Sequence, residues 1–297
     1  MDRCVTDVHI SVLSKEVLEH LRPERGKVYV DGNLGLGGHA QQILQASEPD
    51  GTVVGFEWDD QAAQLAQQRL EIFEKRLCLV PLSYAQLLEG LKTTEFDMVD
   101  GLLLDLGVSS LQLDKGERGF SFQVDAPLDM RMDRRQSETA AKLVRRLSKD
   151  DLADIFYNYG EERQARRIAA HLVEAREKCP IETTRQLAEL VADSIPRRYH
   201  PKKKHVATKV FQALRIAVNR ELDNLVKILG DAPSVLVSGG RICVITFHSL
   251  EDRIVKQAFA NNPEYRVVTK KPVNPTAREV MENPRARSAK LRVAEKV

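Results

Sequence analysis

The chain has 297 residues, 42% of them hydrophobic and 30% charged, with a formal net charge of only +2, which is typical of an ordinary globular protein of one large or two smaller domains. Its cysteines, Cys4, Cys78, Cys179 and Cys243, are too scattered for a zinc or redox motif, which favours a reducing compartment. No apolar run reaches about 18 residues and the amino terminus lacks a signal-peptide core, so we expect no membrane partner and a cytoplasmic location.

Helix and strand signals alternate through the first hundred residues, a pattern typical of a βαβ series. We expect helices over 13–21, 39–46 and 61–75, and strands over 27–30, 52–57, 77–81 and 98–105. From about 108 to 209 the sequence is polar and helical, with capping boxes at Ser148 and Thr183 and a helix stop at Gly160. The remaining expected elements are a long helix over 206–229 and strands over 239–247, 266–269 and 290–294.

The strand signals resume only after a gap of about one hundred residues, which indicates a domain inserted into a split sheet. We therefore predict an α/β fold, with a Rossmann-like domain formed by residues 1–107 and 211–297 and an inserted all-helical domain over 108–210.

Basic residues concentrate in the expected insert. Residues 131–210 hold 19 Lys or Arg against 12 Asp or Glu, whereas the rest of the chain holds 26 against 31. The insert is thus a candidate for binding nucleic acid, and the run Lys202 to Lys204 beside Tyr199 is its best segment. The alternative to nucleic-acid binding is a solvent-exposed helix face on which these basic residues form salt bridges.

The stretch from Asp31 to His39, DGNLGLGGH, lies where the first expected strand turns into a helix. Glycines at this position let the backbone bend tightly and leave its amides bare, so the loop is a candidate cradle for a small ligand. A purely structural turn is the alternative.

Carboxylates end the next two strands of the series. Because ligands of open parallel sheets bind beyond the carboxyl ends of the strands, Asp31, Glu57 and Asp105 are expected to meet in one crevice. Three acids there disfavour a pyrophosphate and suit S-adenosylmethionine, which carries a sulfonium, an ammonium and a ribose diol. Glu57 is the expected ribose clamp, and a solvated surface charge is its alternative.

At this point the sequence resembles a known family, the bacterial 16S ribosomal RNA cytosine-N4 methyltransferases. The motifs run in order along nearly the whole chain: DGNLGLGGH at 31–39, LDLGVSS at 104–110, RGFSF at 118–122, PLDMRM at 127–132, YGEE at 159–162, ATKVFQA at 207–213, FHSLEDR at 247–253 and NPRARS at 283–288.

The resemblance implies a Rossmann-like class I methyltransferase that uses S-adenosylmethionine to methylate the exocyclic N4 amine of a cytidine in the decoding region of 16S rRNA, within the small ribosomal subunit. It also implies that the helical insert helps to grip RNA, and a homodimer is compatible with it. Carried over position by position, the cofactor contacts fall on Gly37, Gly38, His39, Glu57, Tyr84, Asp105 and Gln112. Position 57 is often aspartate in the family, but the longer glutamate still reaches a diol.

Methylation of a cytosine amine requires acceptors for its N–H groups, because its lone pair is delocalised into the ring. The chain lacks the Pro-Pro-aromatic tetrad that many amino-methyltransferases use, so we infer that the turn from Asp105 to Ser109 supplies them, through Ser109, Ser110 or the Gly107 carbonyl. His248, at another strand end, is a candidate for holding the cytosine or taking up its proton; a buried histidine bonded to backbone is the alternative.

Phe120 and Phe122 are candidates for stacking on a flipped base, or else form a small local core. No His or Cys cluster predicts a metal site, and a carboxylate site for magnesium stays open. Two other functions remain as alternatives: a nicotinamide-dependent oxidoreductase, which lacks its usual glycine spacing here, and an RNA-binding ribosome-assembly factor with a relict cofactor pocket.

Overall fold

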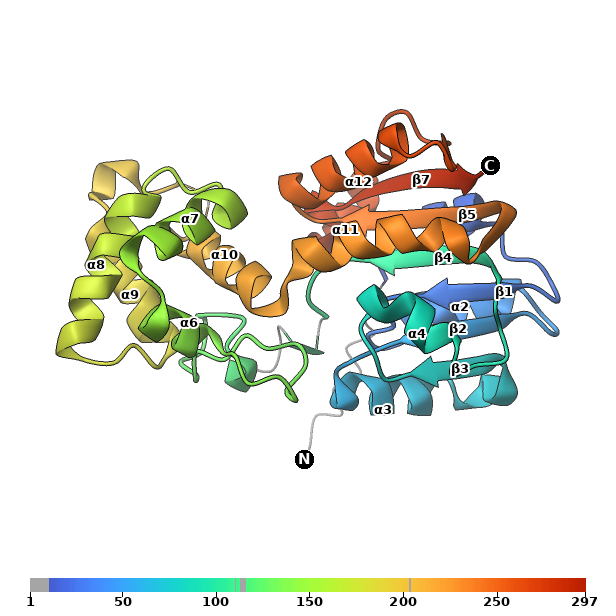
Figure 1. Ribbon diagram of the computed structural model, residues 1–297, viewed down its shortest axis with the longest axis horizontal. Helices are drawn as coiled ribbons and strands as arrows, with labels where there is room; N and C mark the ends of the chain where they lie inside the picture. The colour runs from blue at the N-terminus through green and yellow to red at the C-terminus, as the bar shows by residue number, and fades with distance from the viewer. Residues whose placement is uncertain (1–10, 110, 113–115, 203) are drawn as a thin grey trace. The chain divides into compact units, whose positions relative to one another are not determined.

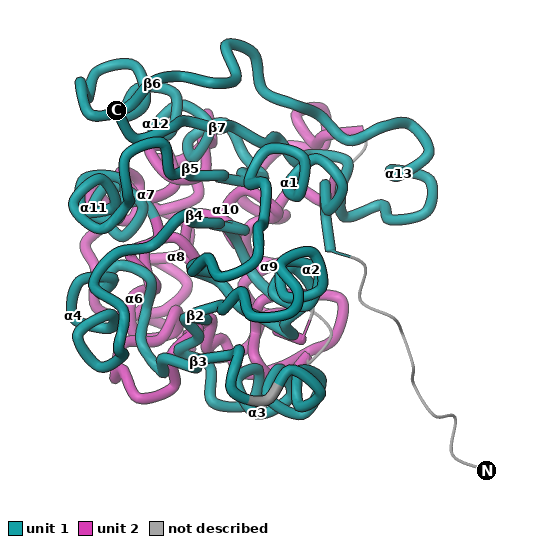
Figure 2. Tube along the Cα trace, turned by 90° about the vertical axis from the view of Figure 1, so that its right-hand side faces the viewer, with its two compact units in different colours: residues 1–109, 222–297 teal, residues 110–221 magenta. Residues whose placement is uncertain are grey.

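The computed structural model describes residues 11–109, 111–112, 116–202 and 204–297 (Figure 1). The chain forms two compact units, which Figure 2 colours separately: unit 1 comprises Met1–Ser109 and Leu222–Val297, and unit 2 comprises Ser110–Glu221. The sequence placed the second boundary at 210/211, whereas the units meet at 221/222. The difference arises because helix α10, Thr208–Asn219, packs against helices of unit 2.

Unit 1 is built on a seven-stranded sheet with the strand order β3-β2-β1-β4-β5-β7-β6. The first five strands are parallel to their neighbours and β7 runs antiparallel to both β5 and β6. Every expected strand is present, and the bounds are β1 Val28–Asp31, β2 Thr52–Phe56, β3 Leu77–Val80, β4 Val99–Asp105, β5 Leu236–Thr246, β6 Tyr265–Val267 and β7 Lys290–Lys296. The strand order reverses between β1 and β4, so their carboxyl ends flank the crevice where such sheets bind ligands.

Helices cover both faces of this sheet. Helices α1 (Ser14–Leu21), α2 (Gly38–Ala46) and α3 (Asp60–Arg69) pack on one face, and α4 (Leu87–Leu91), α11 (Glu221–Asp231) and α12 (Ser249–Asn261) pack on the other. Successive residues of the central strands alternate between these two cores: Leu103 joins the first, whereas Leu102 and Leu104 join the second. Burial on both faces explains why the strands read as continuous apolar runs, and it leaves the strand ends for polar groups.

The helix expected over 206–229 is wrong as a single element. It is two helices, α10 and α11, broken at Arg220, whose φ of 51° is left-handed. The helix expected over 61–75 is also shorter: α3 ends at Arg69, and a 3-10 turn, Glu71–Arg76, follows it. Hydrophobic spacing persists across both breaks, so periodicity alone does not reveal them.

Unit 2 is helical, with no strand among its described residues. Its helices are α6 Ala140–Arg146, α7 Lys149–Gly160, α8 Ala165–Lys178, α9 Thr184–Ser194 and α10. The capping boxes expected at Ser148 and Thr183 are confirmed at the starts of α7 and α9, and α7 ends at Gly160 as expected. Within the described residues of both units, no helix is long and apolar enough to cross a membrane.

Candidate active site

The glycine loop after β1 is hydrogen-bonded to the two neighbouring strands, β4 and β2. The amide of Gly32 donates to the Leu103 carbonyl at 2.8 Å, and the amide of Leu34 donates to the Phe56 carbonyl at 3.0 Å. Gly37 caps α2 with a left-handed φ of 76°, and a Cβ there would lie 2.7 Å from Leu70 Cδ1. The loop therefore requires glycine for packing as well as for access to its amides.

Glu57, the residue after β2, is buried rather than solvated, with 6% of its surface exposed. Its Oε2 accepts a hydrogen bond from the Gly35 amide at 2.9 Å, and its Oε1 accepts one from the Asp59 amide at 2.8 Å. Burial raises the pKa of Glu57 to about 8, although both amides act to lower it. Each oxygen of an ionised carboxylate has a second lone pair, so Glu57 can still accept two hydroxyl groups.

Asp31 ends β1 and is 1% exposed. Its Oδ1 accepts from the Asn33 amide at 3.2 Å, whereas its Oδ2 is buried without a hydrogen-bond partner. Burial raises the pKa of Asp31 to about 6; nearby His39 opposes this shift and nearby Asp105 adds to it. Asn33 also donates its side-chain amide to the Asp105 carbonyl at 2.7 Å, which joins the ends of β1 and β4.

His39 lies in the first turn of α2, and its Nε2 is 3.6 Å from Asp105 Oδ2. Burial acts to lower the pKa of His39, but Asp105, Asp31 and Glu279 together raise it above its ordinary value. The surrounding carboxylates therefore favour the charged form of His39. Glu279, from helix α13 (Ala277–Glu282), also accepts a hydrogen bond from the Leu13 amide at 2.6 Å. No sequence motif marked Glu279, because only the fold brings it to His39.

Unsatisfied polar groups converge on this edge of the sheet. Among the described residues, four buried side-chain atoms lack a hydrogen-bond partner, and they belong to Asp31, His39, Asp105 and His248. Leaving a buried polar group unpaired costs about 1–3 kcal/mol, and such groups are rare in native proteins. Their concentration where β1, β4 and β5 end indicates a site that is completed by a ligand.

His248 caps helix α12. Its Nδ1 accepts from the Glu251 amide at 3.3 Å, while the Glu251 carboxylate accepts from the amides of Phe247 and His248 at 2.8 and 3.3 Å. The bond to Nδ1 places the proton of the neutral ring on Nε2, which makes no well-directed hydrogen bond and lies 3.2 Å from Glu251 Oε1. Sequence reasoning missed Glu251, because capping boxes are sought after Ser or Thr rather than His.

Tyr84 and Ser109 both lie against the glycine loop. A Cβ built on Gly32 would be 3.2 Å from Tyr84 Cβ, and one built on Gly35 would be 3.9 Å from Ser109 Cβ. Tyr84 is 7% exposed and begins the turn Tyr84–Gln86 after β3. The structure thus brings these two side chains to the loop from the ends of two different strands.

Three more residues are expected at the site: Gly38, Gln112 and Ser110. Gly38 is the first residue of α2 and is buried. Gln112 is buried and belongs to unit 2. Ser110 lies outside the described residues. No group of three or more His, Cys, Asp or Glu among the residues that the structure describes is arranged to hold a metal ion.

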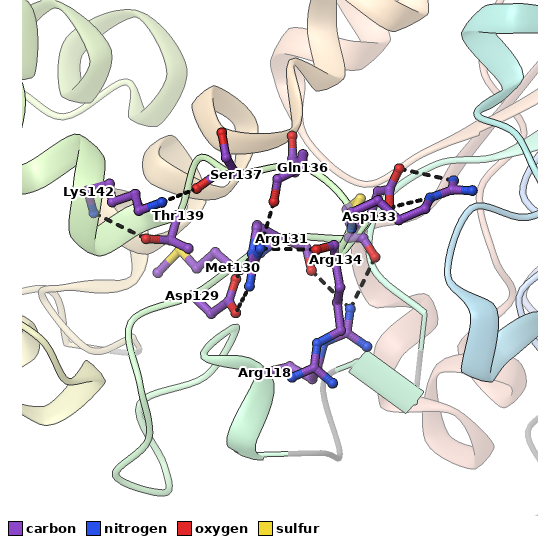
Figure 3. Close-up of polar contacts among 12 residues, drawn as sticks. Arg118, Asp129, Met130, Arg131, Asp133, Arg134, Gln136, Ser137, Thr139 and Lys142 are labelled. Carbon is purple, nitrogen blue, oxygen red and sulfur yellow. Dashed lines mark hydrogen bonds and ion pairs between the residues drawn. The ribbon is translucent and has the colours of Figure 1, made fainter.

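Two of the motifs build a polar loop in unit 2 (Figure 3). Arg118 is 2% exposed and donates to the carbonyls of Arg131 and Met132 at 2.9 and 3.1 Å. Arg131 is doubly hydrogen-bonded to Asp129, at 2.7 and 2.9 Å, and between these two residues Met130 has a left-handed φ of 61°. The RGFSF and PLDMRM motifs therefore form one rigid, strained loop.

The aromatic residues of the RGFSF motif pack within unit 2. The ring centroid of Phe122 is 4.8 Å from those of both His205 and Phe211, and Phe120 is 9% exposed, with the Arg118 guanidinium 5.9 Å from its ring. These contacts favour the local core over the base-stacking alternative.

Comparison with known proteins gives a match over almost the whole chain. The family model described as the MraW methylase family matches residues 6–297. The ribosomal RNA small subunit methyltransferase H of Desulfotalea psychrophila is 56% identical over 290 residues, which cover 98% of this chain and 98% of that protein. The protein of the same name from Geotalea uraniireducens is 50% identical over 307 residues, covering 97% of this chain and 98% of its own length.

Proposed function

The chain belongs to the MraW methylase family, and from this premise we propose that it transfers a methyl group from S-adenosylmethionine to the exocyclic N4 amine of a cytidine in the decoding region of 16S rRNA. Unit 1 is accordingly the Rossmann-like sheet of a class I methyltransferase. The observation that carries the proposal is the pair of unpartnered carboxylate oxygens, on Asp31 and Asp105, beside the glycine loop.

The residues present fit the cofactor. Glu57 has free lone pairs for the ribose diol, and the loop amides from Gly37 to His39 suit the single carboxylate of the amino acid portion. The unsatisfied oxygens of Asp31 and Asp105 suit its positive charges, and Tyr84 is the candidate contact of the adenine. When bound, S-adenosylmethionine supplies an electrophilic methyl group on a sulfonium.

Asp105 and Ser109 are the groups that we assign to the cytosine amine. The unpartnered Asp105 Oδ1 is a buried acceptor for an amine N–H, and Ser109 follows on the same turn beside Gly35. Accepting these hydrogen bonds restores electron density to the amine nitrogen and fixes its direction. His248 Nε2, at the end of the adjacent strand, is the proposed contact on the cytosine edge.

The two alternative functions gain no support. A nicotinamide-dependent oxidoreductase must seat a pyrophosphate, which the carboxyl groups of Asp31, Glu57 and Asp105 disfavour. A ribosome-assembly factor with a relict pocket would have no reason to retain unsatisfied acids that cost folding stability. The substrate that we propose is the RNA within the small ribosomal subunit, gripped in part by the basic insert; a homodimer is compatible with this chemistry and not required by it.

Nucleoside mass spectrometry tests the reaction. Small subunits from cells that lack this protein are incubated with the purified enzyme and S-adenosylmethionine, digested and analysed. We expect N4-methylcytidine to form with the wild type and with Asp231→Asn, whose carboxylate forms an ion pair with the exposed Lys227, and not with Asp105→Asn. Methylation of another atom, or full single-turnover activity of Ser109→Ala, would remove the corresponding part of the proposal.

A further inference from the structure

A long segment of unit 2 carries no acidic side chain. Between Asp193 and Glu221, 27 residues include eight Lys or Arg and neither Asp nor Glu. Within it, Arg197, Arg198, Lys202 and Lys204 are exposed. A run of exposed cations without neighbouring carboxylates in sequence is suited to a polyanion.

An exposed aromatic ring lies within this cationic segment. Tyr199 is 54% exposed, and the Arg198 guanidinium lies over its ring, 4.8 Å from the centroid. Among the Phe, Tyr and Trp side chains that the structure describes, only Tyr157 on α7 is similarly exposed, at 63%. The pairing of a planar cation with an exposed ring gives a flat surface that is both apolar and positively charged.

The turn that presents this ring is held in place by hydrogen bonds. Tyr199 ends the 3-10 turn Arg197–Tyr199, and its amide donates to the Pro196 carbonyl at 2.9 Å. The next residue, His200, is anchored through Nε2 to the Ile195 carbonyl at 2.9 Å. A surface that is ordered before binding loses little conformational entropy when a ligand docks on it.

We propose that Tyr199, with Arg198 stacked on it, is a platform for one unpaired base of the RNA substrate, and that Arg197, Lys202 and Lys204 neutralise the adjoining phosphates. Unpaired bases are recognised by stacking on aromatic rings and guanidinium planes, whereas a duplex hides the faces of its bases. The platform therefore selects a single-stranded nucleotide of the substrate RNA. The inference rests on the proposed function, because it takes RNA as the substrate.

Fluorescence anisotropy of the full chain tests the platform. The probes are a labelled single-stranded oligocytidine of about 12 nucleotides, within the range that such sites cover, and a perfectly paired RNA duplex of the same length. We expect Tyr199→Ala to weaken single-strand binding about 5- to 100-fold, the range for one lost base stack, with no change on the duplex. Tyr199→Phe keeps the ring and should bind like the wild type, as should the control Tyr157→Ala.

Salt dependence separates stacking from charge. Tyr199→Ala should leave the slope of log affinity against log salt unchanged, whereas Lys202→Ala should reduce its magnitude by about 0.7, the value for one phosphate contact on a single strand. Equal single-strand binding by Tyr199→Ala and the wild type would overturn the platform, as would an equal loss on the duplex. Methyl transfer by the wild type is measured in parallel. If the wild type methylates the RNA while Tyr199→Ala binds it normally, the platform is overturned and the proposed function is not.

Discussion

The carboxylate of Glu57 accepts a hydrogen bond from the backbone amide of Gly35, at 2.9 Å and across 22 residues of sequence. This bond ties the residue after β2 to the middle of the glycine loop after β1. Since the other oxygen of Glu57 accepts from the Asp59 amide, one buried side chain fixes the loop and remains able to accept two hydroxyl groups.

Replacing Glu57 by glutamine tests this double role. A glutamine keeps one acceptor oxygen but turns an NH2 group toward the amide of Gly35 or Asp59, so one backbone donor is left unsatisfied. We expect the variant to lose about 1–3 kcal/mol of unfolding free energy, and S-adenosylmethionine affinity to fall about tenfold or more. Denaturant unfolding and isothermal titration measure the two effects, with the exposed Glu19→Gln on α1 as the control. Unchanged affinity would remove Glu57 from the cofactor site.

Cofactor binding should depend on pH because two carboxyl groups of the protein, at the expected cofactor site, have raised pKa values. The pKa of Asp31 is raised to about 6 and that of Glu57 to about 8, so Glu57 gains a proton as the pH falls through about 8 and Asp31 as it falls through about 6. A cationic ligand favours the ionised forms, and its binding must release these protons at low pH. We expect S-adenosylmethionine affinity to rise from pH 6 to pH 8 and then level off.

S-adenosylhomocysteine provides the matched comparison for this pH effect, because it shares every group except the charged sulfonium. Its affinity should rise less steeply over the same window, and it should release fewer protons. Titration in buffers of different ionisation enthalpy counts those protons. Equal proton release by the two ligands would mean that the acids do not respond to the sulfonium.

The requirement for glycine at position 37 can be separated into two costs. The left-handed φ of Gly37 costs an L-residue about 1–2 kcal/mol, and its contact with the buried Leu70 adds overpacking of about 1–3 kcal/mol. Gly239 has a similar φ of 81° with nothing within 4 Å, so Gly239→Ala should show the first cost alone. We expect thermal unfolding to rank Gly37→Ala as the less stable variant. Equal stability of the two would contradict the tight packing of the loop.

His248 is both a helix cap and a proposed substrate contact, and two substitutions distinguish these roles. Asparagine is itself a good cap, so His248→Asn should keep the stability of α12, whereas His248→Ala should lose about 1 kcal/mol. If Nε2 acts on the cytosine, both variants should lose about 100-fold or more in single-turnover rate. A fully active His248→Asn would reduce the role of His248 to capping.

Much of this architecture can be predicted from the sequence, for an identifiable physical reason. Strands buried on both faces leave continuous apolar runs, and a parallel sheet forces residues such as Asp31 and Asp105 to the same edge. The break at Arg220 and the approach of Glu279 to His39 could not be predicted, because both depend on packing between segments far apart in the sequence. The family resemblance led to Tyr84 and the turn after a strand end led to Ser109, but their position against the glycine loop is visible only in three dimensions.

The central claim is that unsatisfied carboxylates beside a glycine loop seat a cationic methyl donor, and isothermal titration tests it most directly. We predict that the wild type and the surface control Asp231→Asn bind S-adenosylmethionine at one site per chain and do not bind NAD. Asp31→Asn should weaken that binding about tenfold or more, since a hydrogen bond to a charged group contributes about 1.5–3 kcal/mol. A wild type that does not bind S-adenosylmethionine, or an Asp31→Asn variant that binds it equally well, would contradict the claim.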